Sequence, residues 1–192
     1  MPFSRFDSPA VPTDRWYLAS PRLKSGDEVD PRLFTTGRPL DWAAPLFVPL
    51  RRRGRPLDFT LADFDMPVVS AALASLLQLK APDCFQLLPA KVEGDPGQFF
   101  VLNATRAVPC ISDRHSLILR WTSEDGRPDK VGTYRMVANP VLTPSNHRGE
   151  AIFRAAGWEI MLLATETLAQ ALQASDFTGL KLVALPEATG DA

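Results

Sequence analysis

The sequence predicts an α+β fold, with a single domain containing two similar strand-helix-strand units, an antiparallel sheet and a proline-rich, irregular N-terminal part. Two stretches have the cap residue and leucine spacing of an amphipathic helix, and an apolar stretch follows each of them. Gly and Pro separate further short apolar stretches, as in hairpins. The chain has 18 prolines in 192 residues. Many lie in the first third, where they disfavour helix because proline lacks the backbone donor.

Length and composition fit one globular domain. Hydrophobic residues make up 45% of the chain and charged residues 22%, the usual proportions for a protein with a buried core. We expect residues 1–45 to form an extended or irregular arm, with residues 1–15 extended or disordered. Residues 46–186 are expected to form the α+β domain, and residues 187–192 a tail.

The first helix is predicted to follow an extended segment that ends at Val69. Ser70 stands where its hydroxyl can accept from the amides of the first turn. Leu73 and Leu77 then follow at helical spacing, and residues 81–83 end the helix.

A hairpin is predicted next. Residues 84–92 alternate in hydrophobicity like a strand, and residues 93–97 contain Gly, Asp and Pro, which are typical of a turn. Residues 99–105 form the second strand, which we expect to be antiparallel to the first.

The middle of the chain gives weaker patterns. Residues 106–130 are rich in loop formers and contain one apolar stretch at residues 117–121. Residues 134–142 fit an extended or a helical segment, and the pattern does not choose between them.

The second unit is predicted near the C-terminus. Residues 152–155 and 159–163 are expected to be strands. Thr165 is expected to cap a helix, Gly179 to follow its end, and residues 180–185 to form the last strand.

The two predicted helices match one another with a shift of 95 residues, which places Ser70 on Thr165, Leu73 on Leu168 and Leu77 on Leu172. Leucines at these spacings occur in any amphipathic helix. The match continues without a gap through the cap and the following strand, which favours a duplication. Caps and core leucines build the scaffold, so partner-specific chemistry is expected in the unshared residues, chiefly 20–65 and 106–150.

Several classes of function are disfavoured by composition. The net charge is −1 and the pI is about 6.1, so a strongly basic nucleic-acid-binding protein is not expected. No secretion signal or membrane-spanning apolar stretch is visible, so we expect a cytoplasmic protein that does not bind a membrane. Paired Cys and His spacings are missing from the sequence, so neither a metal nor another cofactor is expected.

One catalytic arrangement remains open. Cys110, Asp113 and His115 lie close together in the sequence and form the chemical set of a small hydrolase-like enzyme. This alternative requires the three side chains to converge in a cleft. A buried cysteine beside a surface-loop histidine is the simpler interpretation.

Several motifs resemble those of a bacterial immunity-protein family, long described as a domain of unknown function and found beside polymorphic-toxin genes. The matching stretches are Val69–Leu73, Phe99–Asn103, Ile152–Arg154, Thr165–Leu168 and Thr178–Leu180. The resemblance covers residues 45–186. It implies a cytoplasmic, non-enzymatic inhibitor that binds one cognate toxin, as a monomer or a homodimer, and covers the toxin's active site.

Charged residues in the unshared segments are candidates for contacts with such a toxin. Acidic side chains facing a basic toxin cleft would speed association. The predicted contact residues are Asp27, Glu28, Asp30, Asp58, Asp63, Asp65, Asp113, Arg114 and His115. The basic run at residues 51–55 offers a weaker alternative, contact with nucleic-acid phosphates.

Overall fold

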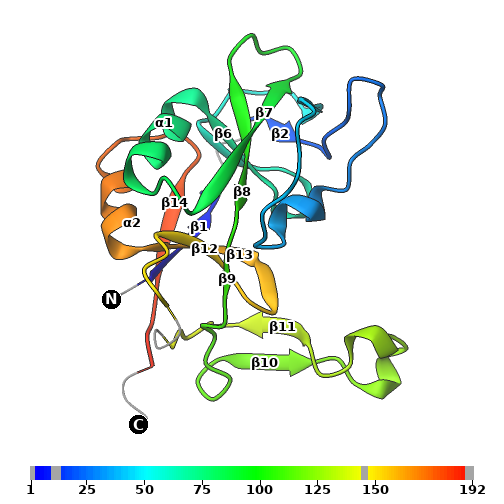
Figure 1. Cartoon of the computed structure of the whole chain (residues 1–192), viewed down its shortest axis with the longest axis vertical. Helices are drawn as coiled ribbons and strands as arrows, with labels where there is room; N and C mark the ends of the chain where they lie inside the picture. Colours follow the sequence, from blue (N-terminus) through cyan, green and yellow to red (C-terminus); the bar gives the residue numbers. More distant parts are fainter. Residues whose placement is uncertain (1–2, 10–13, 144–146, 189–192) are drawn as a thin grey trace.

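The computed structural model of the chain describes residues 3–9, 14–143 and 147–188. The fold is α+β, with most strand pairs antiparallel. Figure 1 shows the two α-helices on one side of the molecule and a separate β-hairpin at its lower end.

The first five-stranded sheet is built from the first half of the chain. Its strands, in spatial order, are β3 (Leu46–Val48), β7 (Phe85–Val92), β8 (Phe99–Ala104), β6 (Pro67–Ser70) and β5 (Phe59–Leu61). Only the β3–β7 pair in this sheet is parallel. The predicted strands at residues 84–92 and 99–105 are thereby confirmed as an antiparallel pair.

The second five-stranded sheet joins the two ends of the chain. Its strands, in spatial order, are β14 (Lys181–Leu185), β1 (Phe3–Asp7), β13 (Trp158–Thr165), β12 (Ile152–Ala155) and β9 (Ala107–Val108). The segment at residues 3–7, expected in an extended or disordered arm, is an inner strand with partners on both sides. Residues 1–2, 10–13 and 189–192 of the predicted arm and tail lie outside the described residues. The division at residues 45 and 186 stays a prediction.

Two small sheets and four 3-10 helices complete the fold. The short strand β2 (Tyr17–Leu18) pairs with β4 (Leu50–Arg52), and β10 (Leu117–Arg120) pairs with β11 (Tyr134–Ala138). The segment whose conformation the sequence left open is therefore a strand at its start. The 3-10 helices are η1 (Pro31–Thr35), η2 (Asp63–Asp65), η3 (Ser123–Asp125) and η4 (Pro128–Lys130).

The two α-helices begin where the sequence predicts, but their caps differ. In α1 (Ala71–Lys80) the Ser70 hydroxyl accepts from the Leu73 amide at 3.3 Å. Thr165 stands at the cap position of α2 (Glu166–Gln173), yet its side chain makes no cap hydrogen bond. The expectation that Thr165 caps through its hydroxyl is therefore wrong, although its extended backbone still starts the helix.

Each α-helix connects two strands that flank a third, antiparallel strand. The central strand of the first unit is β8, where Phe99 pairs with both Ser70 and Ala90. The central strand of the second unit is β1, where Phe3 pairs with both Thr165 and Leu185. The two pairs of partners are related by the same shift of 95 residues. That one unit is a copy of the other stays a prediction.

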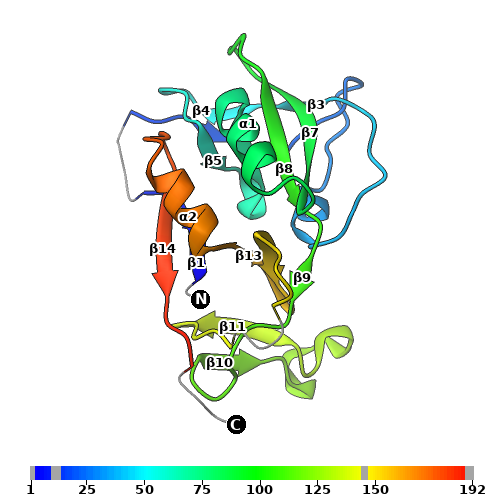
Figure 2. The same ribbon diagram turned by 60° about the vertical axis from the view of Figure 1, so that its left-hand side comes forward.

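One apolar core lies between the two sheets and receives both α-helices. Leu73 and Leu77 of α1 and Leu168 and Leu172 of α2 are at most 2% exposed and belong to this shared core. Figure 2 shows α1 beside β5 and β8, and α2 beside β1 and β14. Because both helices bury their leucines in the same place, the two units form one folded body.

A polar link joins the two units at the edge of this core. The Asp58 carboxylate accepts from the Ser70 hydroxyl at 2.8 Å and from the Thr178 hydroxyl at 2.7 Å and amide at 3.0 Å. The Thr178 hydroxyl in turn lies 3.0 Å from the Asp58 amide. Asp58 thus connects the cap of α1 to the loop before β14.

No α-helix in residues 3–9, 14–143 and 147–188 has the length and apolar character needed to cross a membrane.

Removing the Asp58 carboxylate is expected to lower the free energy of unfolding. Asp58→Ala leaves Ser70 and Thr178 without their acceptor, so we expect a loss of about 2 kcal/mol in urea denaturation at neutral pH. Asp27→Ala removes an exposed carboxylate and is the control, expected to cost under about 0.5 kcal/mol. Equal effects of the two substitutions would contradict the role given to Asp58.

The Asp58 contribution is also expected to depend on pH. Burial raises the pKa of Asp58, but hydrogen bonds from Thr178 and Ser70 outweigh it and hold the pKa below the ordinary value of 3.8. A lowered folded-state pKa gives stability that is present above the ordinary value and is lost as the pH falls through the folded-state value. The difference between the wild type and Asp58→Ala should therefore shrink below pH 3.8 in the same measurement.

Candidate functional site

A large groove lies where η1, η2, the start of β13 and the segment that joins β10 to β11 meet. It has a volume of about 770 Å³ and is lined by Arg32, Thr35, Thr36, residues 38–40, Phe64, Trp121, Lys130, Thr133, Tyr134 and residues 157–160. We call it the aromatic groove. Apart from the β12–β13 turn, its walls come from segments 20–65 and 106–150, where the sequence analysis expected partner-specific chemistry.

Phe64 is the most unusual residue of the aromatic groove. Its backbone has φ 55° and ψ 37°, and the next residue, Asp65, has φ 58°. Left-handed backbone at residues other than glycine costs free energy, on the order of 1 kcal/mol each. The Phe64 side chain is nonetheless 51% exposed. An exposed ring on strained backbone points to a functional role, because the fold itself gains little from it.

Cations lie over the aromatic rings of the groove. The Arg32 guanidinium carbon is 3.6 Å from the centroid of the Phe64 ring. Across the groove, Lys130 Nζ is 5.3 Å from the Trp121 ring and the Arg120 guanidinium is 4.5 Å from the Tyr134 ring. These distances are those of cation–π contacts, which hold the charged groups against the groove wall.

The wall formed by β13 combines apolar side chains with one carboxylate. Trp158, Glu159 and Ile160 line the aromatic groove, and Ile160 is 46% exposed. Rings and aliphatic groups with a few fixed charges are the usual composition of the central part of a protein–protein interface.

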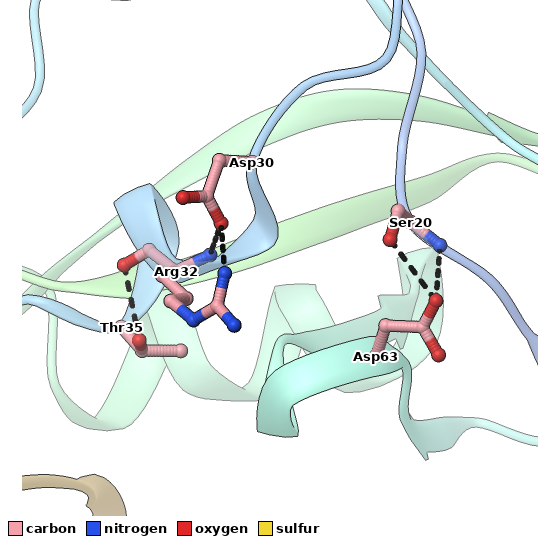
Figure 3. Close-up of polar contacts among 5 residues, drawn as sticks. All are labelled: Ser20, Asp30, Arg32, Thr35 and Asp63. Atoms are coloured by element: carbon pink, nitrogen blue, oxygen red, sulfur yellow. Dashed lines mark hydrogen bonds and ion pairs between the residues drawn. The ribbon is translucent and has the colours of Figure 1, made fainter.

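Two of the predicted contact residues, Asp30 and Asp63, are used within the fold. Asp30 begins η1 and accepts from the Arg32 amide at 2.9 Å, and the Arg32 guanidinium lies 3.4 Å from the same carboxylate. Asp63 accepts from the Ser20 amide at 2.9 Å and hydroxyl at 3.0 Å, and it also binds Arg51 at 2.7 Å. Figure 3 shows these carboxylates pointing at different partners. They set the positions of η1 and η2.

The other acidic candidates of the first half lie in different surroundings. Asp27 and Glu28 are exposed in the loop before η1, and Asp27 accepts from the Ser25 hydroxyl at 2.6 Å. Asp65 is half-buried, and this burial raises its pKa although the positive charge of Arg154 acts in the opposite direction. Asp58 belongs to the link between the two units, described above.

The candidates at residues 113–115 lie in the turn before β10. Asp113 accepts from the Tyr134 hydroxyl at 2.6 Å and also from Arg120. These hydrogen bonds hold the pKa of Asp113 below its usual value. His115 Nδ1 lies 2.9 Å from the Ser112 hydroxyl, and Arg114 is exposed. Asp113 thus fixes a ring and a cation at the edge of the aromatic groove.

The structure does not bring Cys110, Asp113 and His115 together as the catalytic alternative requires. Cys110 is fully buried in an apolar cluster, and burial raises the pKa of its thiol to about 11. Asp113 is bound to Tyr134 and Arg120, while His115 is bound to Ser112. Cys110, Asp113 and His115 therefore do not form the convergent cleft that a nucleophilic dyad requires.

Among the described residues, no three or more His, Cys, Asp or Glu side chains are grouped closely enough to hold a metal ion.

Sequence reasoning missed the residues that distinguish the aromatic groove, above all Phe64, Trp121 and Trp158. Their exposure depends on how distant segments pack, which spacing along the chain does not reveal. Phe64 stands between Asp63 and Asp65, but Ala62 and Met66 continue an apolar alternation through it. That pattern is typical of a half-buried strand, so the sequence carries no signal that the Phe64 ring is exposed.

The cysteines provide a test of the catalytic alternative. A buried thiol with a raised pKa reacts slowly because the thiolate is the reactive species. With iodoacetamide at pH 7.5, half-buried Cys84 should be alkylated first, and Cys110 should react at least about a hundredfold more slowly until the protein is unfolded. Mass spectrometry of tryptic peptides measures both rates. Rapid alkylation of Cys110 in the folded protein would revive the catalytic hypothesis.

Comparison with known proteins agrees with the resemblance seen in the sequence. No curated protein matches the chain. The model of the immunity protein family Imm11 matches residues 8–185, which is nearly the whole chain and includes η1, η2, both α-helices and the β10–β11 hairpin. The chain belongs to the Imm11 family of immunity proteins.

Proposed function

We propose that this chain is an immunity protein that binds one cognate bacterial toxin in the cytoplasm and neutralises it by covering its active site. Membership of the Imm11 family supports the immunity role. The buried Cys110 and the separate partners of Asp113 and His115 favour binding over catalysis. Covering a toxin site requires an interface of roughly 800 Å² on each partner.

The toxin-binding surface that we propose is centred on the aromatic groove. The observation that carries this choice is Phe64, a ring held 51% exposed on left-handed backbone. Binding energy in interfaces concentrates in a few large side chains near the centre, often aromatic residues and arginine. Arg32 over Phe64 supplies such a pair on one wall, and Trp121 with Lys130 supplies another.

The acidic residues predicted as direct contacts have a different role in this proposal. Asp30 orients Arg32, and Asp113 orients Tyr134. Asp63 holds η2, which contains Phe64, against Ser20. We infer that these carboxylates position the groove. Asp27, Glu28 and Arg114 lie outside its lining, and direct contact of these three residues with the toxin stays a prediction. The chain would bind as a monomer or as a homodimer.

We further infer that the two strand-helix-strand units derive from one duplicated unit. The equal register around Phe99 and Phe3 supports this. The buried positions of the helices agree as well, because Leu73, Ala74 and Leu77 correspond to Leu168, Ala169 and Leu172. Apart from residues 157–160, the aromatic groove is lined by segments outside the two units.

Co-expression tests the proposed function. The toxin domain encoded beside this chain's gene should arrest growth of a bacterial host, and expression of the chain should restore it. An inactive variant of the toxin should co-purify with the chain. If the chain neither restores growth nor co-purifies with the inactive toxin, the proposed function is excluded.

The role of Phe64 can be separated from a role in folding. Phe64→Gly removes the ring and also relieves the left-handed backbone, so the variant should be as stable as the wild type or slightly more stable. Its affinity for the inactive toxin should nevertheless fall at least about tenfold, as expected for a central aromatic residue. Calorimetry measures both quantities. Leu79→Ala, which truncates a side chain 73% exposed on α1, is the control and should leave the affinity unchanged. A wild-type affinity in Phe64→Gly would exclude the groove from the interface.

A further inference from the structure

The charge of the aromatic groove has one predominant sign. Among the described residues that line it, the cations are Arg32, Arg38 and Lys130, and the only carboxylate is Glu159. This imbalance contrasts with the whole chain, whose net charge is −1. The groove is therefore a local positive surface on a nearly neutral protein.

The carboxylate of Glu159, the one carboxylate among the described residues that line the groove, interacts with the positive charge of the buried Arg154. Arg154 of β12 is fully buried, and its Nη1 donates to the Ile160 carbonyl at 3.1 Å. Within the described part of the chain, its Nε and Nη2 have no hydrogen-bond partner. Burial lowers the pKa of Arg154 to about 10, with the charges of Asp65 and Glu159 acting in the opposite direction. The side chain therefore stays protonated at neutral pH, and Glu159 faces a cation already present.

The cations of the groove are compensated only by exposed carboxylates. Within the described part of the chain, neither Arg38 nor Lys130 has a carboxylate at ion-pair distance, although the charge of Lys130, after the hydrogen bond from Arg127, helps to lower the pKa of Asp129. Arg32 has Asp30 at 3.4 Å, but both side chains are more than half exposed, and such a pair contributes little in water. The positive charge thus remains available to a partner.

We propose that the toxin segment that enters the aromatic groove is acidic and carries a large apolar side chain beside its carboxylates. This inference rests on the proposed function. The guanidinium of Arg38 suits a carboxylate, which it can bind through two parallel hydrogen bonds. The apolar side chain would fill the space between Phe64 and Ile160, whose exposed surface is otherwise left in water.

This assignment reverses the polarity expected from the sequence. Acidic stretches of the chain were expected to face a basic toxin cleft. In the fold, Asp30, Asp63 and Asp113 accept hydrogen bonds from the Arg32 amide, Ser20 and the Tyr134 hydroxyl, and cations line the groove instead. An acidic toxin segment therefore complements the surface that the structure presents.

Charge reversal in the groove tests the proposal. The double variant Arg38→Glu with Lys130→Glu should slow association with the purified inactive toxin at least about tenfold at low salt. Wild-type association should slow as salt rises, and the variant should lose this dependence or invert it. The matched control is Lys24→Glu with Lys91→Glu, which changes the net charge equally at a separate surface pocket. Surface plasmon resonance at two salt concentrations gives the rates, and thermal unfolding confirms that both variants fold.

Chemical coupling identifies the opposing groups directly. A carbodiimide joins an amine to a carboxylate that it touches, so Lys130 should be coupled to an Asp or Glu of the toxin in the wild-type complex. Coupling confined to Lys24, Lys80, Lys91 or Lys181 would overturn the proposal, as would equal slowing by the groove and control variants. Tight, salt-dependent binding of the groove to a single-stranded oligonucleotide in place of the toxin would assign it to nucleic acid and also overturn the proposal.

The test separates this inference from the proposed function. If the wild type neither binds nor neutralises the toxin, both are wrong. If the wild type binds and the groove variant is no slower than the control, the immunity role stands and the acidic occupant is wrong.

Discussion

Both five-stranded sheets depend on one apolar core, in which α1, α2 and the strands around them bury their apolar side chains. Leu73 and Leu77 from one unit and Leu168 and Leu172 from the other are buried there together. Neither unit alone would bury its leucine face, so the stability of each depends on the other. Asp58 reinforces the same junction at its edge, by joining the cap of α1 to the loop before β14.

The separation of the shared core from the aromatic groove indicates which residues can change without loss of the fold. The shared core needs apolar residues and a cap at set positions, which leaves little freedom in the units themselves. The segments that form η1, η2 and the β10–β11 hairpin lie outside that core, and they meet to form the aromatic groove. Under the proposed function, changes in the groove can therefore alter the choice of partner without disturbing the packing of Leu73 or Leu168.

The elements that the sequence predicted are those encoded locally. Ser70 with Leu73 and Leu77 defines a helix within one short window, and the strands at residues 85–92 and 99–104 are joined by a turn with its own chemistry. The inner strand β1 was missed because its partners lie more than 150 residues away. The groove was missed for the same reason. The sequence around an acidic residue such as Asp30 does not reveal whether its carboxylate binds another protein or Arg32 of the same chain.

The position of β1 in the second sheet affects when the newly made chain can fold. Residues 3–7 are made well before their partners in β13 and β14, so the second sheet cannot close until residues 158–185 have left the ribosome. The shared core waits for the same residues, because α2 lies between those strands. Under the proposed function, the protein can therefore bind its partner only after residues 158–185 have been made and have folded onto β1. Folded protein must therefore be present before the toxin enters the cell. A newly made chain would give no immediate protection.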